Sequence, residues 1–332
     1  MSAGVALVGI GMWGRRMAAA AARAGLRVVT CFARSADKRD AFAAEIGCVF
    51  ARSFEEAIAH PDVSGVLLCT PNDVHEEQTA LAAARGRHVF VEKPIADTVE
   101  AGERMRAACL DAGVTLMVGH AFRRLGAARR TRELVEAGAL GRVVLAEASF
   151  SLPGSFPEGA WRAHRERNPG GPLMQLGIHC VDTLASWLGP IERSTGRFAH
   201  VATEADVDDV GVVTLEFASG ALGVVTGSYV SPKTLWMRLQ GTEAVLEYRA
   251  DFAVWPDTQA LDAHTHLLLN GEHMAFDRCD MLCLELAEFG RCITDGATPE
   301  TGAAEGLMAL KAIEDALPKG SDLPFAHPEV EA

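Results

Sequence analysis

Lys93 lies where a charged side chain of an α/β protein can reach a bound ligand. It is the middle residue of Glu92-Lys93-Pro94, which follows the apolar segment 88–91 and precedes a helical stretch that begins near Thr98. The pattern predicts a lysine at the carboxyl end of a buried strand, and in α/β sheets that end faces the crevice where ligands bind. The alternative is an ordinary surface lysine after a strand, and position alone does not separate the two interpretations.

His179 is the second residue whose type and surroundings suit chemistry. It follows the glycine pair 170–171 on a segment with the pattern of an amphipathic helix, and Gln175 and Asp182 lie four residues before it and three after it. That spacing puts the three polar side chains on one face of the predicted helix. An isolated helical histidine is more often a core residue, but a face carrying Gln, His and Asp behind two glycines indicates a binding site.

The segment Gly9-Ile10-Gly11-Met12-Trp13-Gly14 has the composition of a phosphate-binding turn. It follows the apolar run 5–8, opens an alanine-rich helix that ends near residue 25, and precedes a second predicted strand, 27–32. Glycines permit a tight turn, close approach of the backbone to a pyrophosphate, and close packing of the helix on the strand. Because the glycines stand in the strand–turn–helix context that the motif requires, dinucleotide binding is the favoured interpretation.

The residues after the second predicted strand indicate which dinucleotide binds. A site that prefers NAD usually has Asp or Glu there, to accept a hydrogen bond from the ribose 2′-hydroxyl, whereas this chain has Ala33-Arg34-Ser35, with Lys38 one turn further on. A guanidinium and a hydroxyl suit a 2′-phosphate, so the sequence favours NADP over NAD. The alternative is that Arg34 is a solvated loop residue that stacks on adenine in either cofactor.

The order of predicted elements divides the chain into two domains. Strands and helices alternate up to the strand 116–119, which predicts a doubly wound parallel sheet within residues 1–121. Beyond this point the segments are mostly strands joined by short connections, which predicts a second α+β domain, residues 122–332, on one open antiparallel sheet. Its predicted strands are 143–150, 209–217, 221–229, 235–240 and 244–248, and helices near 279–294 and 303–317 end the chain.

Composition argues against several classes of partner. The 332 residues are 49% hydrophobic and 23% charged, with a formal net charge of -13. This charge argues against nucleic acid and anionic membrane surfaces, and no apolar run is long enough to span a bilayer. The eight cysteines contain no CxxC pair, which is typical of reduced thiols in a cytoplasmic protein. His264, His266, Cys279 and Cys283 match no zinc spacing, so no metal site is expected.

Several ordered motifs together resemble one family. They are Gly9 to Gly14, Thr70-Pro71-Asn72 with His75, Glu92-Lys93-Pro94, Gly119-His120-Ala121-Phe122-Arg123, Trp161-Arg162, and Gly170 to Asp182. The chain resembles the family named for glucose-fructose oxidoreductase, inositol dehydrogenase and the rhizopine-catabolism protein MocA, over essentially its whole length. The family often has Asp where this chain has Gln175, and its NAD-dependent members usually have Asp at the position of Ala33.

The resemblance implies a Rossmann domain, an open-faced sheet domain, an NAD(P) cofactor, and hydride transfer to or from a carbon that bears a hydroxyl. Lys93 corresponds to the family's catalytic lysine, His179 to its general acid/base, and Asp182 to a helix-anchoring residue. The expected cofactor contacts are Gly9, Gly11, Met12, Trp13, Gly14, Ala33, Arg34, Ser35, Lys38, Thr70, Pro71, Asn72, His75, Glu92 and Lys93. The expected substrate contacts are Lys93, His120, Arg123, Trp161, Arg162, Gln175 and His179. Of these, His120, Arg123 and Arg162 are of second rank, and the alternative for each is a structural hydrogen-bonding role.

The sequence therefore predicts an NADP-preferring dehydrogenase or reductase of a sugar, a polyol or a related small molecule. A non-catalytic NADP-sensing regulator is one alternative, although the presence of both Lys93 and His179 counts against it. A one-way reductase of a keto sugar or an enone is another. We also expect a homodimer or homotetramer, because the second domain's open sheet has an outer face, with Val212, Thr214 and Glu216 on one side of a strand, that needs cover.

Overall fold

The computed structural model describes residues 3–154, 156, 160–251 and 260–318, except for the side chains of residues 36–39. The chain divides into two compact units. The first comprises Met1–Ala121 and Met281–Leu307, and the second comprises Phe122–Asp280 and Met308–Ala332. Among the described residues, no helix combines the length and the apolar character needed to cross a membrane.

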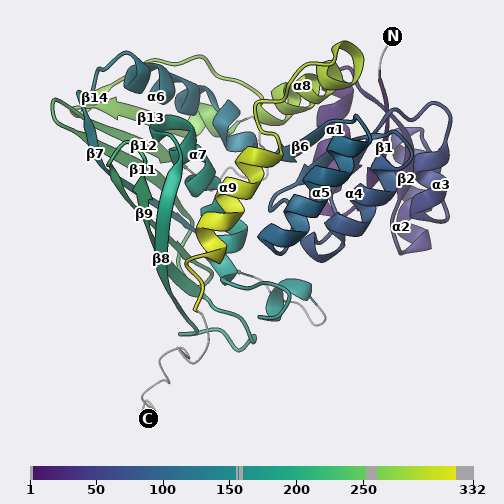
Figure 1. Cartoon of the computed structure of the whole chain (residues 1–332), viewed down its shortest axis with the longest axis horizontal. Helices are drawn as coiled ribbons and strands as arrows, with labels where there is room; N and C mark the ends of the chain where they lie inside the picture. Colours follow the sequence, from purple (N-terminus) through teal and green to yellow (C-terminus); the bar gives the residue numbers. More distant parts are fainter. Residues whose placement is uncertain (1–2, 155, 157–159, 252–259, 319–332) are drawn as a thin grey trace. The chain divides into compact units, whose positions relative to one another are not determined.

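The first unit is built on a six-stranded, fully parallel sheet with the order β3-β2-β1-β4-β5-β6 (Figure 1). The strands are β1 (Gly4–Val8), β2 (Arg27–Phe32), β3 (Val49–Phe50), β4 (Gly65–Leu68), β5 (His88–Glu92) and β6 (Leu116–Gly119). The connecting helices are α1 (Met12–Arg23), α2 (Ala36–Ile46), α3 (Phe54–Ala59), α4 (His75–Ala83) and α5 (Val99–Asp111), with the 3₁₀ turn η1 (Asn72–Val74) ahead of α4. Strands β1 and β4 are buried throughout, as expected for central strands covered on both faces. The predicted doubly wound parallel sheet is confirmed.

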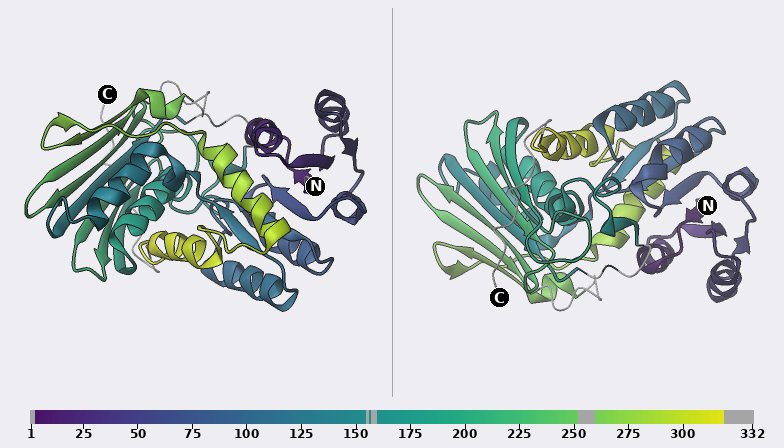
Figure 2. Two further views of the ribbon diagram at one scale, coloured as in Figure 1. Left: turned by 90° about the horizontal axis from the view of Figure 1, so that it is seen from above. Right: turned by 90° about the horizontal axis from the view of Figure 1, so that it is seen from below.

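A helix from the far end of the chain completes this unit. Helix α8 (Met281–Asp295) packs beside α1 (Figure 2), and its Phe289 ring lies 5.8 Å from the Phe90 ring of β5. Gly65 of β4 leaves space for this contact, because a Cβ there would lie 3.1 Å from Phe289. The sequence division placed all of 122–332 in the second domain, whereas Met281–Leu307 cluster with the first unit. The apolar face of α8 does not itself show which sheet it covers.

The second unit contains an eight-stranded sheet with the order β14-β13-β12-β11-β7-β10-β9-β8. Its strands are β7 (Val143–Ser151), β8 (Ile191–Ala199), β9 (Val210–Phe217), β10 (Leu222–Ser228), β11 (Thr234–Gly241), β12 (Val245–Ala250), β13 (Thr265–Leu269) and β14 (Glu272–His273). Its helical elements are η2 (Ala121–Arg124), α6 (Gly126–Glu136), η3 (Trp161–Ala163), a π-helical segment η4 (Leu173–Gly177), α7 (Ile178–Leu188) and η6 (Leu261–His264); α9 (Ala303–Glu314) begins in the first unit and ends in the second.

The predicted open sheet is present, but one pairing differs from the prediction and three of its strands, β8, β13 and β14, were not predicted. The β7–β10 pair is parallel, while the other pairs are antiparallel. A parallel pair needs a long crossover, and the chain between these strands includes helix α7 and two further strands. Strand β8 was not predicted, because it is an edge strand whose alternation is obscured by charged residues such as Glu192, Arg193 and Arg197.

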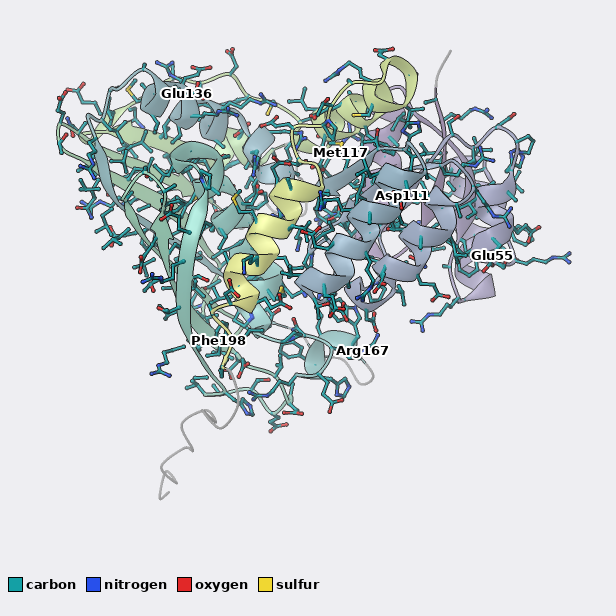
Figure 3. The ribbon with its side chains drawn as sticks, viewed as in Figure 1. Glu55, Asp111, Met117, Glu136, Arg167 and Phe198 are labelled. Carbon is teal, nitrogen blue, oxygen red and sulfur yellow. The ribbon has the colours of Figure 1, made fainter. Side chains whose placement is uncertain are left out.

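Burial alternates along the strands, so the sheet of the second unit has a packed face and an open face. In β9, Val213, Leu215 and Phe217 are buried, whereas Thr214 and Glu216 are exposed. Helices α6 and α7 lie against the packed face, and no helix of the described residues covers the other (Figure 1). Side chains stand out from this open face in the stick view (Figure 3).

Candidate functional site

The glycine-rich turn after β1 is shaped for a phosphate. Helix α1 begins at Met12, and its N-cap residue, Gly11, gives no side-chain hydrogen bond to the first turn. Gly9 has φ 89°, and a Cβ there would lie 2.4 Å from the carbonyl oxygen of Cys69; a Cβ on Gly14 would lie 2.0 Å from the carbonyl oxygen of Gly9. Only glycine therefore fits at these two positions of the turn. The backbone N–H groups at the start of α1 can bind an anion. These residues fit a dinucleotide pyrophosphate.

Lys93 follows β5, two strands from β1 in the same sheet. Its neighbour Glu92 is 7% exposed, and burial raises the pKa of Glu92 to about 7, against the opposing effects of the Trp13 indole and the Lys93 ammonium. Trp13 belongs to the glycine-rich turn. The carboxyl of Glu92 is thus sensitive both to this turn and to the strand end that carries the half-buried Lys93. The Lys93–Pro94 peptide bond is cis.

His75 joins the ends of two neighbouring strands. Its Nδ1 lies 3.2 Å from the carbonyl oxygens of Pro94 and Ile95, and its Nε2 lies 3.0 Å from the carbonyl oxygen of Thr70. The ring is 1% exposed, and burial lowers the pKa of His75 despite these three carbonyls. A neutral imidazole donates from one nitrogen only. His75 therefore holds the loop after β4 against the loop after β5, which contains Lys93.

The other expected cofactor contacts after β4 are also built into the fold. Asn72 is 3% exposed, and the Thr70 hydroxyl donates to the side-chain oxygen Oε1 of Gln78 at 2.7 Å. Gln78 is a residue that the sequence patterns did not single out, although it lies one turn after His75 on α4. These contacts fix the loop that follows β4.

The residues expected to recognise the cofactor's ribose lie after β2. Arg34 and Ser35 are exposed, and Ser35 is the N-cap residue of α2 without a side-chain capping hydrogen bond. Lys38 lies in α2, but its side chain is outside the described part of the chain. The fold thus presents a guanidinium and a hydroxyl to solvent beside the carboxyl end of β2.

In the second unit, His179 is held by an aromatic stack. The imidazole lies 4.2 Å from the Phe122 ring, centroid to centroid, at an interplanar angle of 18°. The Phe150 ring lies 6.0 Å away and is tilted by 44°. His179 is 6% exposed. Phe122 was not identified from the sequence as a site residue. The sequence indicated it only through its place beside Arg123 in the Gly119–Arg123 motif.

Arg123 and Asp182 form a buried two-pronged ion pair. The Nε and Nη2 atoms of Arg123 donate to the two carboxylate oxygens of Asp182, both at 2.7 Å. Arg123 is 8% exposed and Asp182 1%. Asp182 lies one turn beyond His179 on α7, so the short element η2 holds this helix at two successive turns, through Phe122 and Arg123.

The segment before His179 is not a regular α-helix. Leu173–Gly177 forms a π-helical turn that runs into α7, and Gln175, 4% exposed, lies within it. The sequence predicted one helix face for Gln175, His179 and Asp182, but the wider π turn changes the angular spacing between Gln175 and His179. Such turns are frequent at functional sites.

The remaining expected substrate contacts differ in their surroundings. Arg162 is exposed, and its guanidinium lies 4.3 Å from the centre of the Trp161 ring. His120 belongs to the first unit and is 1% exposed. Within each unit, then, the structure brings together Trp13, Glu92 and Lys93 on one side, and Phe122, His179, Arg123 and Asp182 on the other.

A parallel sheet with an uncapped glycine-rich turn, a lysine at a strand end and a second unit with a stacked histidine define a two-domain nicotinamide-dependent oxidoreductase. Comparison with known proteins agrees. Residues 3–120 match the oxidoreductase family with an NAD-binding Rossmann fold, and residues 128–247 match the GFO/IDH/MocA C-terminal domain. The chain belongs to the Gfo/Idh/MocA family and is an NAD(P)-dependent oxidoreductase, as the sequence predicted.

Relatives and solved structures match most of the chain. It is 32% identical over 289 residues to D-xylose 1-dehydrogenase (NADP(+)) 2 of Haloferax volcanii, covering 85% of this chain and 86% of the relative. It is 29% identical over 314 residues to 1,5-anhydro-D-fructose reductase of Ensifer adhaerens, covering 92% of each. The crystal structure of an NADPH-dependent oxidoreductase from Desulfitobacterium hafniense has a TM-score of 0.91 and 32% identity, covering 95% of this chain and 94% of that one.

Proposed function

We propose that this protein is an NADP-preferring dehydrogenase or reductase whose substrate is a sugar, a polyol or a closely related molecule. The observation that carries the proposal is the combination, in one parallel sheet, of the uncapped turn at Gly11 and the strand end that bears Lys93. The names of the relatives, a D-xylose dehydrogenase and an anhydrofructose reductase, support a sugar-like substrate.

Lys93 and His179 are the proposed catalytic residues. The nicotinamide, when bound, accepts or supplies a hydride. In the direction of oxidation, His179 takes the proton of the substrate hydroxyl, and in reduction it returns that proton. The Lys93 ammonium donates a hydrogen bond to the same oxygen and stabilises the negative charge that develops on it. Gln175, His120, Trp161 and Arg162 remain proposed substrate contacts.

Arg123 has a different proposed role from the one that its motif suggested. Its guanidinium already binds Asp182 through Nε and Nη2, so contact with the substrate would use the N–H groups that Asp182 leaves over. We infer that Arg123 and Asp182 chiefly orient α7, and with it His179.

A panel of aldoses, polyols and keto sugars, assayed with NADP and NAD in parallel by the absorbance of the reduced cofactor, tests the function directly. Turnover with at least one sugar or polyol is the expected result. NADPH binding without turnover on any member of the panel would favour the sensing alternative. Reduction that runs in one direction only, with a keto sugar or an enone, would favour the one-way reductase.

The preference for NADP rests on Arg34 and Ser35, which are exposed beside β2 with no carboxylate in Ala33-Arg34-Ser35. Arg34→Ala should raise the Kd of NADPH at least about tenfold more than that of NADH, since a charge-assisted contact contributes roughly 1.5–3 kcal/mol. Fluorescence titration with both cofactors measures this. Equal losses for the two would mean that Arg34 stacks on the adenine instead.

The open sheet face of the second unit supports a homodimer or homotetramer. Leu222 and Val212 on this face are 55% and 37% exposed, and a groove there is lined by Glu147, Trp236 and Arg238. A second copy would cover these residues. Light scattering should therefore give a multiple of 35.3 kDa at micromolar concentration, and a monomer would contradict the proposal. None of the eight cysteines, which all lie among the described residues, forms a disulfide, and this supports the proposed cytoplasmic location.

A further inference from the structure

Tyr229 is a buried tyrosine of the second unit that the proposed reaction does not use. It directly follows β10 and is 5% exposed. Its N–H donates to the Asp209 carbonyl oxygen at 2.8 Å, and its carbonyl oxygen accepts from the Gly154 N–H at 2.7 Å. The Phe156 ring packs edge-on against it, with 5.4 Å between the ring centroids. The ring therefore has a fixed place from which its hydroxyl can act on a neighbouring segment.

The hydroxyl of Tyr229 holds the glycine pair ahead of the π-helical turn. It donates to the Gly171 carbonyl oxygen at 3.1 Å, and burial raises the pKa of Tyr229 to about 12, so this donor keeps its proton at neutral pH. Gly171 has φ 46°, and a Cβ there would lie 2.0 Å from the Asp208 carbonyl oxygen. Only glycine fits at this position, two residues before the turn that contains Gln175.

Asn168 links the same point to the backbone of Arg162. This asparagine is 0% exposed, and its Nδ2 donates to the Arg162 carbonyl oxygen at 3.0 Å. Its own carbonyl oxygen accepts from the Gly171 N–H at 3.1 Å, and its Nδ2 also makes a long contact, 3.5 Å, with the Tyr229 hydroxyl oxygen. Asn168 and Tyr229 thus form a relay between the backbone of Arg162 and the backbone of Gly171.

A second set of contacts ties the segment between Arg162 and Gly171 to the loop before β9. The Arg165 N–H donates to the Asp206 carbonyl oxygen at 2.6 Å, and Nη1 of Arg165 donates to Oδ1 of Asp208 at 2.7 Å. These bonds do not depend on the Tyr229 hydroxyl. Loss of that one hydroxyl should therefore shift the glycine pair and the turn that follows it, without unfolding the segment.

His179 is anchored by other groups. The Phe122 ring stacks on its imidazole, and the Arg123–Asp182 ion pair holds α7 one turn further on. Neither contact includes Tyr229. A change in the relay should therefore displace the turn before α7 more than the imidazole itself, and so alter substrate binding more than proton transfer.

We propose that Tyr229 and Asn168 are positioning residues that set the spacing between Arg162 and Gln175, and thereby determine which sugars or polyols the protein prefers. A substrate that contacts both residues needs them at a fixed separation, because hydrogen bonds weaken steeply with distance and angle. The inference rests on the proposed function, since it takes Arg162 and Gln175 as substrate contacts. The relay itself is a feature of the fold and can be tested without a substrate.

Tyr229→Phe tests the role in substrate binding, because it keeps the ring and removes the hydroxyl. We measure it with the member of the sugar and polyol panel that the unmodified protein turns over fastest, at saturating cofactor. KM should rise by about threefold to tenfold, and kcat should change by less than about twofold. Tyr248→Phe is the matched control: Tyr248 is the other tyrosine of the chain, lies in β12 and is 0% exposed, and its replacement should leave KM unchanged. An unchanged KM in Tyr229→Phe, or an equal rise in both variants, would overturn the proposal.

Two further comparisons separate specificity from general damage. The order of kcat/KM over the panel should change in Tyr229→Phe and stay the same in Tyr248→Phe; a uniform loss with an unchanged order would contradict the role in specificity. Asn168→Ala should raise the same KM, and its combination with Tyr229→Phe should raise KM no further than the larger single effect, because both changes break one relay. Effects that multiply would show two independent contacts and would contradict the relay.

Hydrogen exchange of the full-length protein tests the relay without a substrate. Peptides within residues 162–177 should exchange about fivefold faster in Tyr229→Phe than in the unmodified protein, the effect of one lost hydrogen bond, whereas peptides within α7 should exchange at the same rate. Unchanged exchange in 162–177, or an equal increase in α7, would overturn the proposal. If the unmodified protein turns over no member of the panel, the proposed function fails, and the exchange rates still decide whether the relay holds the turn.

Discussion

The two proposed catalytic residues are held by different physical means. The loop that carries Lys93 is held by groups whose protonation matters: His75 contacts three backbone carbonyls, and Glu92 is a buried carboxyl with a pKa near 7. His179 is held by groups whose charge is already balanced or absent, the Phe122 ring and, one turn along α7, the Arg123–Asp182 pair. The stability of the region around Lys93 should therefore depend on pH. The position of His179 should depend on the packing of Phe122 and on the Arg123–Asp182 ion pair.

The largest expected effect comes from removing the reacting groups themselves. His179→Ala should lower kcat by roughly 10²–10⁴-fold and Lys93→Ala by roughly 10²–10³-fold, because the first removes a positioned acid/base and the second one preorganised donor. Both variants should fold and bind NADPH. Steady-state kinetics and fluorescence titration measure the two quantities. Turnover retained by Lys93→Ala would reduce that residue to a structural role.

Breaking the Arg123–Asp182 ion pair should cause a large loss of stability. Asp182→Ala removes the carboxylate that accepts two hydrogen bonds from the buried Arg123 guanidinium, so the free energy of unfolding should fall by about 3–5 kcal/mol. Glu133→Ala is the control, because its pair with Arg130 is largely exposed and contributes at most about 1 kcal/mol. Chemical denaturation followed by circular dichroism measures both.

A double replacement separates charge from packing. Arg123→Met with Asp182→Leu should recover part of the stability that Asp182→Ala loses, since an apolar pair leaves no buried charge. If the single and double variants are equally destabilised, the contact matters through its shape and not through its charge.

The stability of the region around Lys93 should depend on pH through Glu92. The pKa of Glu92 in the folded state, about 7, lies above its ordinary value of 4.5. The folded state therefore keeps a proton that the unfolded state loses, and the stability associated with that proton is lost as pH rises from about 4.5 to about 7. At about 1.4 kcal/mol per pH unit, the loss is at most about 3 kcal/mol. Glu92→Gln should remove it.

Thermal unfolding between pH 5 and pH 8 measures this effect. The Tm of the unmodified protein should fall across this range by more than the Tm of Glu92→Gln. Glu77→Gln, an exposed carboxyl on α4, is the control and should follow the unmodified protein. Parallel curves for all three proteins would mean that Glu92 is ionised at neutral pH.

Local patterns predicted the first unit better than the second. The turn at Gly9–Gly14 and the Lys93 strand end are consecutive in sequence with the elements that position them, so strand–turn–helix order was enough to place them. The ring contacts of His179 come from Phe150 and Phe122, which are 29 and 57 positions away in the chain, and nothing local to His179 indicates the Phe122 ring. The same holds for α8, whose apolar face is evident but whose partner, β4 and β5, is determined by tertiary packing.

The Arg123–Asp182 ion pair could not be predicted from the sequence for a similar reason. Arg123 was expected to contact the substrate because of its place in the Gly119–Arg123 motif, with a structural role as the alternative, but its two-pronged bond to Asp182 is visible only in three dimensions. The π turn at Leu173–Gly177 was also missed, because spacing rules assume a regular helix.

The smallest effect, and the one that most sharpens the comparison, concerns the aromatic stack. Phe122→Leu keeps an apolar side chain but removes the ring that lies 4.2 Å from the imidazole, and such ring pairs contribute about 0.5–1.5 kcal/mol beyond their buried area. We expect kcat to fall roughly threefold to tenfold, with the KM for NADPH unchanged, because the imidazole loses its fixed plane. Phe150→Leu is the matched control: its ring is equally buried, but it is tilted and lies 6.0 Å from His179, so it should lower the Tm without changing kcat. Phe122→Tyr should restore the rate, because it restores the stack. Equal losses of kcat in Phe122→Leu and Phe150→Leu would show that core volume, and not the stacked face, positions His179.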